Sequence, residues 1–289
     1  MEKAKQCLGR SITVLPNEGH AKFFTLAQLL NGQDSLELYK QGISILTSAL
    51  PRLEDADDKK EAAKDLSSAH CAIAELYMTD LCDNPEAEAE CIQSITNGVE
   101  VDPTNAEAWQ TKARLHLIKC EFDQAKTDLN KSLDLWLPNY MAVLENRAHE
   151  ASKEAFDPVE VCPLLFTTRL VTARMLIELE EWEKANQVLD GLTEEDDEVV
   201  DPWYLLGWLN KLRADFEKDQ IYTGNARYFL NKAKEVHAKN PTQDQEMVRH
   251  IEELLTELGP EEEEAEEEGD AKDEWEDVDS DNNEDAMDE

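Results

Sequence analysis

The stretch AEAWQTKARLHLIKCEFDQAKTDLNKSLDLWLPN, residues Ala106–Asn139, decides the fold. Small and apolar side chains recur in it every three or four residues, in two runs separated by a short polar break. Such spacing predicts two consecutive amphipathic helices, and a stop is expected at Pro138. The side chains that carry the pattern are Trp109 and Ala113 in the first run and Phe122, Ala125, Leu129 and Leu133 in the second.

This stretch resembles the tetratricopeptide repeat, a helix–turn–helix unit of about 34 residues with the pattern W-x2-L-G-x2-Y…A-x3-F…P. A unit of this kind cannot bury its apolar face alone, so the resemblance implies a stack of copies. We therefore expect an all-α tetratricopeptide-repeat superhelix of about five to six helix pairs. The sharpest further match is Trp203, Leu206 and Gly207. The other predicted helix pairs are 20–31 with 34–50, 61–78 with 85–101, and 163–179 with 181–192.

Several segments depart from the repeat pattern. Residues 52–60 are expected to form a polar linker, and residues 218–224 to form an insertion before the last second helix, which carries Ala226 and Leu230. The amphipathic stretch 139–153 has no obvious partner helix. It either extends the preceding helix or forms an insertion, and the sequence does not decide between these two possibilities.

The predicted domains follow changes in composition. Residues 1–19 are expected to be a flexible arm, residues 20–258 the repeat solenoid, and residues 242–258 its terminal capping helix, with one apolar face and one polar face. Residues 260–289 hold eighteen Asp and Glu against one Lys, which is −17 of the net charge of −38. A segment so charged and so poor in apolar residues predicts a disordered acidic tail over residues 259–289.

The charge and the motifs argue against several classes of function. Phosphate binding needs Lys and Arg, so nucleic acid is not an expected direct ligand. No HExxH, GxSxG, GxGxxG or phosphate loop occurs, and we predict a non-catalytic protein without cofactors. The six cysteines show no CxxC pair and the histidines no zinc-ligand spacing, so no metal site is expected. The chain has no signal-peptide h-region and no apolar run of about 20 residues, which predicts an intracellular protein without membrane contact.

In this repeat family the first helix of each unit lines a concave groove, and five places on that helix face it. Carried over residue by residue, the resemblance places Cys71, Met78, Leu117, Thr167, Leu170 and Lys211 in the groove. It also gives eight predicted client-binding residues: Glu75, Glu107, Gln110, Arg114, Arg174, Glu178, Tyr204 and Trp208. Trp208 stands out because Trp203, Leu206 and Gly207 already fill the core places of its helix. It is interpreted either as an exposed binding anchor or as packing against residues 218–224.

Two further stretches resemble a particular family. EEDDEVVDPWYLLGW (Glu194–Trp208) joins an acidic turn to the last repeat, and DEWEDVDSD (Asp273–Asp281) sets one Trp in an acidic tail. Together with TARMLIEL (Thr172–Leu179), they are similar to the assembly chaperones of large-subunit ribosomal protein L-four. The layout of repeats and tail covers most of the chain, whereas these motifs cover about a tenth of it.

The resemblance implies a dedicated chaperone in ribosome biogenesis. Such a protein would clasp a basic, extended segment of the newly made ribosomal protein in its groove, in the cytoplasm and nucleus, and deliver it to nascent large ribosomal subunits. Nuclear import factors and pre-ribosomes would be further partners. Two alternatives stay open: a general acidic chaperone for histones or other basic proteins, and an adaptor subunit of a larger complex.

Overall fold

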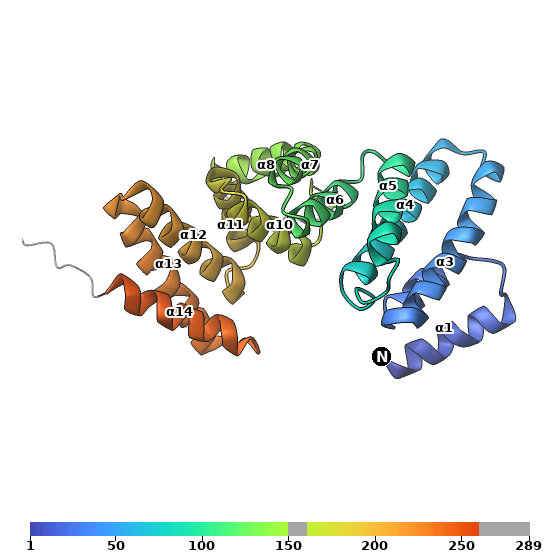
Figure 1. Ribbon diagram of the computed structural model, residues 1–289, viewed down its shortest axis with the longest axis horizontal. Coiled ribbons are helices and arrows are strands. Elements are labelled where there is room, and N and C mark those ends of the chain that lie inside the picture. The colour runs from blue at the N-terminus through green and yellow to red at the C-terminus, as the bar shows by residue number, and fades with distance from the viewer. Residues whose placement is uncertain (150–160, 260–289) are drawn as a thin grey trace, which may run out of the picture. The chain divides into compact units, whose positions relative to one another are not determined.

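The structure, a computed structural model, describes residues 1–149 and 161–259 (Figure 1). In these residues it consists of thirteen α-helices and one short 3-10 helix, η1 (Leu50–Arg52), without a strand. The predicted all-α repeat architecture is confirmed. Five antiparallel helix pairs follow one another along the chain. They are α2 (Ala21–Ala27) with α3 (Gly32–Ala49), α4 (Ala56–Met78) with α5 (Ala87–Val101), α6 (Ala106–Ile118) with α7 (Phe122–Asp134), α10 (Phe166–Glu178) with α11 (Trp182–Glu195), and α12 (Val200–Glu217) with α13 (Gln220–Lys239).

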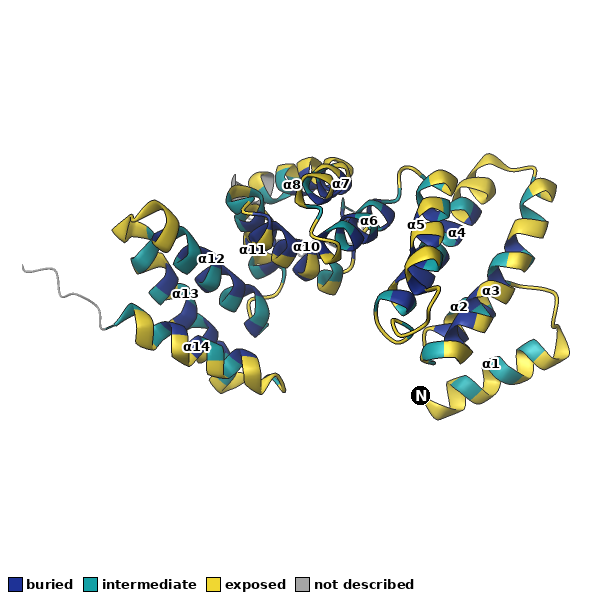
Figure 2. Cartoon of the chain, viewed as in Figure 1, coloured by how far each residue is buried: buried dark blue, intermediate teal, exposed yellow. Residues whose placement is uncertain are grey.

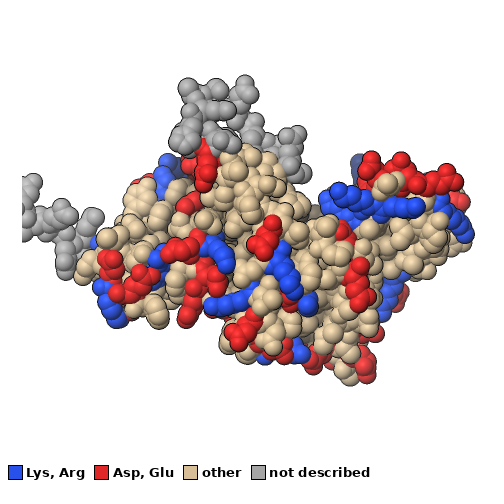
Figure 3. Space-filling view, turned by 90° about the horizontal axis from the view of Figure 1, so that it is seen from above, with Lys and Arg blue, Asp and Glu red and all other residues tan. Residues whose placement is uncertain are grey.

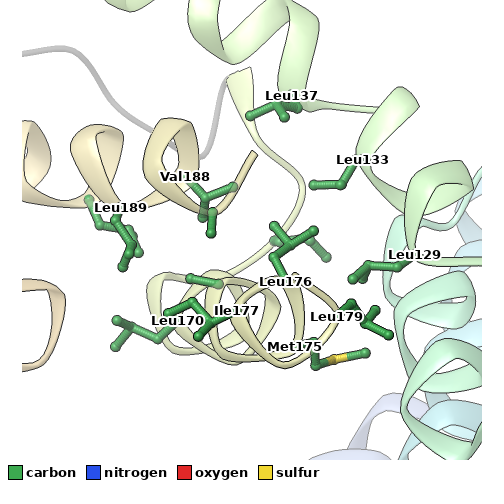
Figure 4. Close-up of a cluster of buried hydrophobic side chains, with 14 of the residues drawn as sticks. Leu129, Leu133, Leu137, Leu170, Met175, Leu176, Ile177, Leu179, Val188 and Leu189 are labelled. Atoms are coloured by element: carbon green, nitrogen blue, oxygen red, sulfur yellow. The ribbon is translucent and has the colours of Figure 1, made fainter. Parts of the chain in front are cut away.

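The buried residues lie on the faces that each helix turns toward its neighbours, and the exposed residues lie on the outer faces (Figure 2). The largest continuous core runs from α6 to α12. Figure 4 shows part of it, in which Leu129 and Leu133 of α7, Leu176 of α10 and Val188 of α11 contribute to the same core. All four side chains are almost completely buried. Since each pair contributes only part of this core, the pairs depend on stacking for their stability.

Equivalent positions in different pairs make equivalent contacts. Trp109 donates its Nε1–H to the carbonyl oxygen of Pro103 at 2.8 Å, and Trp203 donates to that of Asp197, also six residues earlier, at 2.9 Å. At Gly207 a side chain would not fit, because a Cβ there would lie 2.6 Å from Cγ of Leu230. The W-x2-L-G motif therefore marks a close crossing of α12 and α13.

The turns between paired helices are tighter than predicted. Lys218 is in the left-handed conformation with φ of 58°, and α13 begins at Gln220. The insertion expected at 218–224 is therefore wrong: most of it is the first turn of α13. The polar linker expected at 52–60 is also shorter, because Asp55 caps α4 by accepting hydrogen bonds from the backbone of Asp57 and Asp58. An Asp at this position favours helix initiation.

Helix α8 (Leu137–His149) resolves the uncertainty over the segment after the opening repeat. It is a separate helix that follows a turn at 135–136 and packs against α7 and α11. Pro138 lies in its first turn, where a missing N–H costs nothing, so the predicted stop marks a helix start instead. Tyr140 of α8 lies against Gly191, where any Cβ would overlap its ring. Its hydroxyl accepts a hydrogen bond from Arg169 at 2.9 Å. Helix α8 is therefore not an extension of α7, and residues 150–153 of the predicted segment lie outside the described residues.

The two ends of the compact unit Met1–Leu258 differ from the helix pairs between them. The first residues, expected as a flexible arm, contain helix α1 (Glu2–Val14), which contacts α2 but has no buried residue. At the other end α14 (Gln245–Leu258) packs on α13 and α12 through Met247, Ile251 and Leu254, in the place of the expected capping helix. The predicted disordered tail begins at Gly259, and residues 260–289 lie outside the described part of the chain.

Candidate binding groove

The first helices of four pairs, α2, α4, α6 and α10, line a groove that we call the acidic groove. Its first part has a volume of about 530 Å³ and its second part about 330 Å³. Glu75 of α4 and Glu107 of α6 line both parts, so the two parts are continuous at these carboxylates. Residues 163–171 close the opposite side. Four of the eight predicted client-binding residues are brought together here: Glu75, Glu107, Gln110 and Arg114.

The two carboxylates of the groove differ in their partners. Glu75 is exposed and lies 3.4 Å from Nη1 of Arg114. Glu107 is half-buried and accepts a hydrogen bond from the hydroxyl of Ser68 at 3.2 Å. Within the described residues no Lys or Arg side chain forms an ion pair with Glu107. Glu107 is thus a half-buried carboxylate that forms no ion pair in this part of the chain, although the positive charge of Lys64 acts on it.

The pKa values of two groups in the acidic groove, Glu107 and Tyr39, are raised. Burial, with a smaller contribution from Glu75, raises the pKa of Glu107, although the Ser68 hydrogen bond and the charge of Lys64 act in the opposite direction. Burial also raises the pKa of Tyr39 to about 12, and the charges of Glu75 and Glu107 add to this shift. Tyr39 lines the first part of the groove. The groove therefore has a negative potential that favours a bound cation.

Gln110 forms the floor contact between α6 and α10. Its side chain is only 5% exposed, and its Nε2 donates to the carbonyl oxygen of Thr168 at 3.0 Å. Its Oε1 is buried without a hydrogen-bond partner. Because a buried acceptor without a partner costs roughly 1–3 kcal/mol, Gln110 is an unusual residue to find at this position in the free protein.

The apolar side of the groove was not predicted from the sequence. Leu165, which precedes α10, is 69% exposed and lines both parts of the groove. Val171, one and a half turns further along, is also exposed and lines the second part. A large exposed Leu beside two carboxylates makes this a surface for a segment that carries both charge and aliphatic groups. Leu165 lies outside the repeat's groove-facing places, which explains why the repeat pattern did not identify it.

Three other predicted residues line a second pocket of about 410 Å³, which we call the aromatic pocket. Tyr204 and Trp208 of α12 stack in parallel, with centroids 6.4 Å apart, and His250 of α14 meets both rings edge-on. The hydroxyl of Tyr204 also lies 2.8 Å from Nδ1 of His250. Trp208 is half-buried against α14, not against residues 218–224 as the alternative interpretation held. Arg174 completes the lining and is held by Asp201 at 3.0 Å.

The repeat-based mapping places some residues wrongly. Cys71, Leu117 and Leu170 are buried in the core, because their places lie at the edge of the helix face that packs on the next pair. Glu178 is exposed but lines neither of the pockets described above. Thr167 lines the acidic groove. Lys211 pairs with Asp215 at 2.6 Å, so its charge is engaged within the chain.

Charges of both signs are mixed over the face that Figure 3 shows. His116 bridges two acids, with Nδ1 2.6 Å from Glu121 and Nε2 3.4 Å from Asp128. No group of three or more His, Cys, Asp or Glu in residues 1–149 and 161–259 is arranged to hold a metal ion. In the same residues no helix combines the length and the apolar character needed to cross a membrane.

Comparison with known proteins gives two similar sequences. "Probable assembly chaperone of rpl4" from Schizosaccharomyces pombe (strain 972 / ATCC 24843) is 34% identical over 262 residues, which cover 87% of this chain and 72% of the relative. A protein of the same description from Emericella nidulans is 27% identical over 290 residues, covering 91% of this chain and 68% of the relative. No protein-family model matches the chain.

Solved structures agree with these relatives. "Assembly Chaperone of RpL4 (Acl4) (Residues 1-338)" superimposes with a TM-score of 0.61 at 25% identity, covering 74% of this chain and 77% of that one. The "APC/C hetero-tetramer Cut9-Hcn1" superimposes with a TM-score of 0.51 at 11% identity, covering 90% and 40%. At so low an identity this second likeness shows the repeat fold alone.

Proposed function

The chain belongs to the family of assembly chaperones of rpl4, and from this premise we propose that it binds a basic, extended segment of that large-subunit ribosomal protein in the acidic groove. The bound segment would be kept soluble and away from other polyanions until it reaches nascent large ribosomal subunits. The observation that carries the proposal is the half-buried carboxylate of Glu107, which forms no ion pair within the described residues and lines the groove together with the exposed side chain of Leu165.

A basic client segment and the acidic groove are complementary both in charge and in apolar surface. A ribosomal-protein extension rich in Lys and Arg has long aliphatic stems below its charged groups. Glu75 and Glu107 offer countercharges, and Leu165 and Val171 offer contact for the stems. The aromatic pocket adds Tyr204 and Trp208 as a place where a cation or a ring of the same segment can stack.

Delivery to the ribosome places the protein in both cytoplasm and nucleus, with nuclear import factors and pre-ribosomes as transient partners. The acidic segment 260–289, which carries −17, would shield further basic surface of the client. The groove provides specificity and this segment provides long-range attraction, which salt screens.

Pull-down under moderate salt followed by mass spectrometry tests the proposal. Recovery of one large-subunit ribosomal protein supports it, whereas histones would favour the general acidic chaperone and a fixed multiprotein set would favour the adaptor. Deleting residues 260–289 should leave specific binding largely intact. Complete loss of binding on that deletion would assign recognition to the acidic segment instead of the groove.

A further inference from the structure

The second part of the acidic groove brings two carboxylates and a side-chain amide together. Glu75 lines it from α4, and Glu107 and Gln110 line it from α6. The Nε2 of Gln110 donates a hydrogen bond to the carbonyl oxygen of Thr168, while its buried Oε1 accepts none. Because nearly all buried polar atoms in folded proteins have partners, this Oε1 indicates a donor that is missing from the free protein.

We propose that this part of the groove is an arginine-selective subsite for the segment bound under the proposed function. The guanidinium donates hydrogen bonds to the carboxylates of Glu75 and Glu107 and to Oε1 of Gln110. Its aliphatic stem lies on Leu165 and Val171, on the opposite side of the groove.

The arrangement favours arginine over lysine for geometric reasons. A guanidinium is planar, carries five N–H donors in a fixed fork and is weakly hydrated, so it can serve several acceptors at once beside apolar side chains. A lysine ammonium has three donors at a single strongly hydrated point and would leave acceptors unserved. The chain itself shows that a guanidinium can reach this place, since Arg114 lies 3.4 Å from Glu75.

Glu107 is the residue on which selectivity depends most. Glu75 forms an ion pair with Arg114, whereas Glu107 accepts a hydrogen bond from Ser68 and forms no ion pair within the described residues. Burial raises the pKa of Glu107 although Ser68 and the charge of Lys64 act in the opposite direction, which agrees with a carboxylate without an ion-paired cation in the free state. Binding of a guanidinium would supply that partner and fix the position of the segment along the groove.

The test uses the full chain and two fluorescein-labelled peptides, identical except that three arginines in one are lysines in the other. Fluorescence anisotropy at 150 mM salt should give the arginine peptide about tenfold tighter binding, which corresponds to one additional well-placed hydrogen-bonded contact. Glu107→Gln keeps the size of the side chain and should abolish the difference by weakening the arginine peptide alone. Glu100→Gln makes the same charge change at an exposed position of α5 and should leave the difference intact.

A second variant, Gln110→Met, removes Oε1 and should reduce the discrimination about threefold or more, with a melting curve to show that the protein still folds. Equal affinity of the two peptides, no binding of either, or unchanged discrimination in Glu107→Gln would overturn the proposal. The pull-down of the ribosomal protein tests the proposed function separately. A chain that captures this protein but does not discriminate between the peptides keeps its function and loses the arginine subsite.

Discussion

Arg114 is expected to oppose client binding although it lies in the groove. It forms an ion pair with Glu75, in which Nη1 and Oε1 are 3.4 Å apart and the side chains are 35% and 55% exposed. A client cation that binds Glu75 must displace Arg114 and remain close to its positive charge. We therefore predict that Arg114→Gln binds the ribosomal protein more tightly than the wild type, the opposite of what a direct client contact would give.

The magnitude follows from two contributions. Breaking an exposed pair of this kind costs about 0.2–1 kcal/mol. Repulsion between Arg114 and a client cation roughly 7 Å away, at an effective dielectric constant of about 20 and with physiological screening, adds on the order of 1 kcal/mol. Together about 1–2 kcal/mol corresponds to a Kd lower by roughly five- to thirtyfold.

Isothermal titration calorimetry of the full chain with the purified ribosomal protein measures this difference. Lys40→Gln is a matched control, because Lys40 forms a similarly exposed pair with Glu90 at 3.5 Å outside the groove and its removal changes the net charge equally. If Arg114→Gln binds no more tightly than Lys40→Gln, competition within the groove is refuted. Weaker binding would instead show that Arg114 contacts the client directly.

Four further outcomes are expected. Trp208→Ala should weaken client binding by about 2 kcal/mol in calorimetry, with Trp208→Phe retaining much of the affinity; an unchanged Kd would make this Trp purely structural. Glu107→Gln should raise the melting temperature at pH 7.5 but not below about pH 4, since a raised pKa makes the folded state lose stability as pH rises from the unfolded pKa through the folded one; a gain that persists at pH 3.5 contradicts this. Glu180→Gly should stabilise the fold by up to about 1 kcal/mol in denaturant titrations, because φ is 58° there; destabilisation would show that this turn is not strained. Gly207→Ala should cost about 1–3 kcal/mol through overlap with Leu230, and a melting temperature equal to that of the wild type would mean that the helices separate easily.

The repeat pattern predicts the helix pairs because it is local. Trp203, Leu206 and Gly207 are close in sequence, and the reason for each lies in its own pair, as the Gly207–Leu230 contact shows. Helix α8 could not be placed in this way. Its position depends on Tyr140 meeting Gly191 and Arg169, residues that are 51 and 29 positions away and belong to a different pair. No periodicity within α8 contains that information.

The groove was predictable only in part for the same reason. Glu75, Glu107 and Arg114 lie on regular helices, so their place in the repeat predicted the face they occupy. Leu165 lies outside a regular helix, just before α10, so the repeat pattern assigns it no place and does not predict its exposure. Burial of Cys71 and Leu117 could not be predicted either, because it depends on how closely successive pairs pack.

The distribution of counterions, more than the net charge, distinguishes the groove from the rest of the surface. Asp128 is more deeply buried than Glu107, yet it has Lys131 at 3.1 Å, Lys112 at 3.2 Å and His116 at 3.4 Å. The same helix α6 supplies Lys112 and His116 to Asp128, whereas its own Glu107 forms no ion pair within the described residues. A half-buried carboxylate without an ion pair reduces stability. Glu107 in the groove is such a carboxylate and Asp128 is not, which is the arrangement that a site for an incoming cation requires. A total charge of −38 would attract any basic protein, whereas the lack of an ion-paired cation at Glu107 can fix where along the groove a particular one binds.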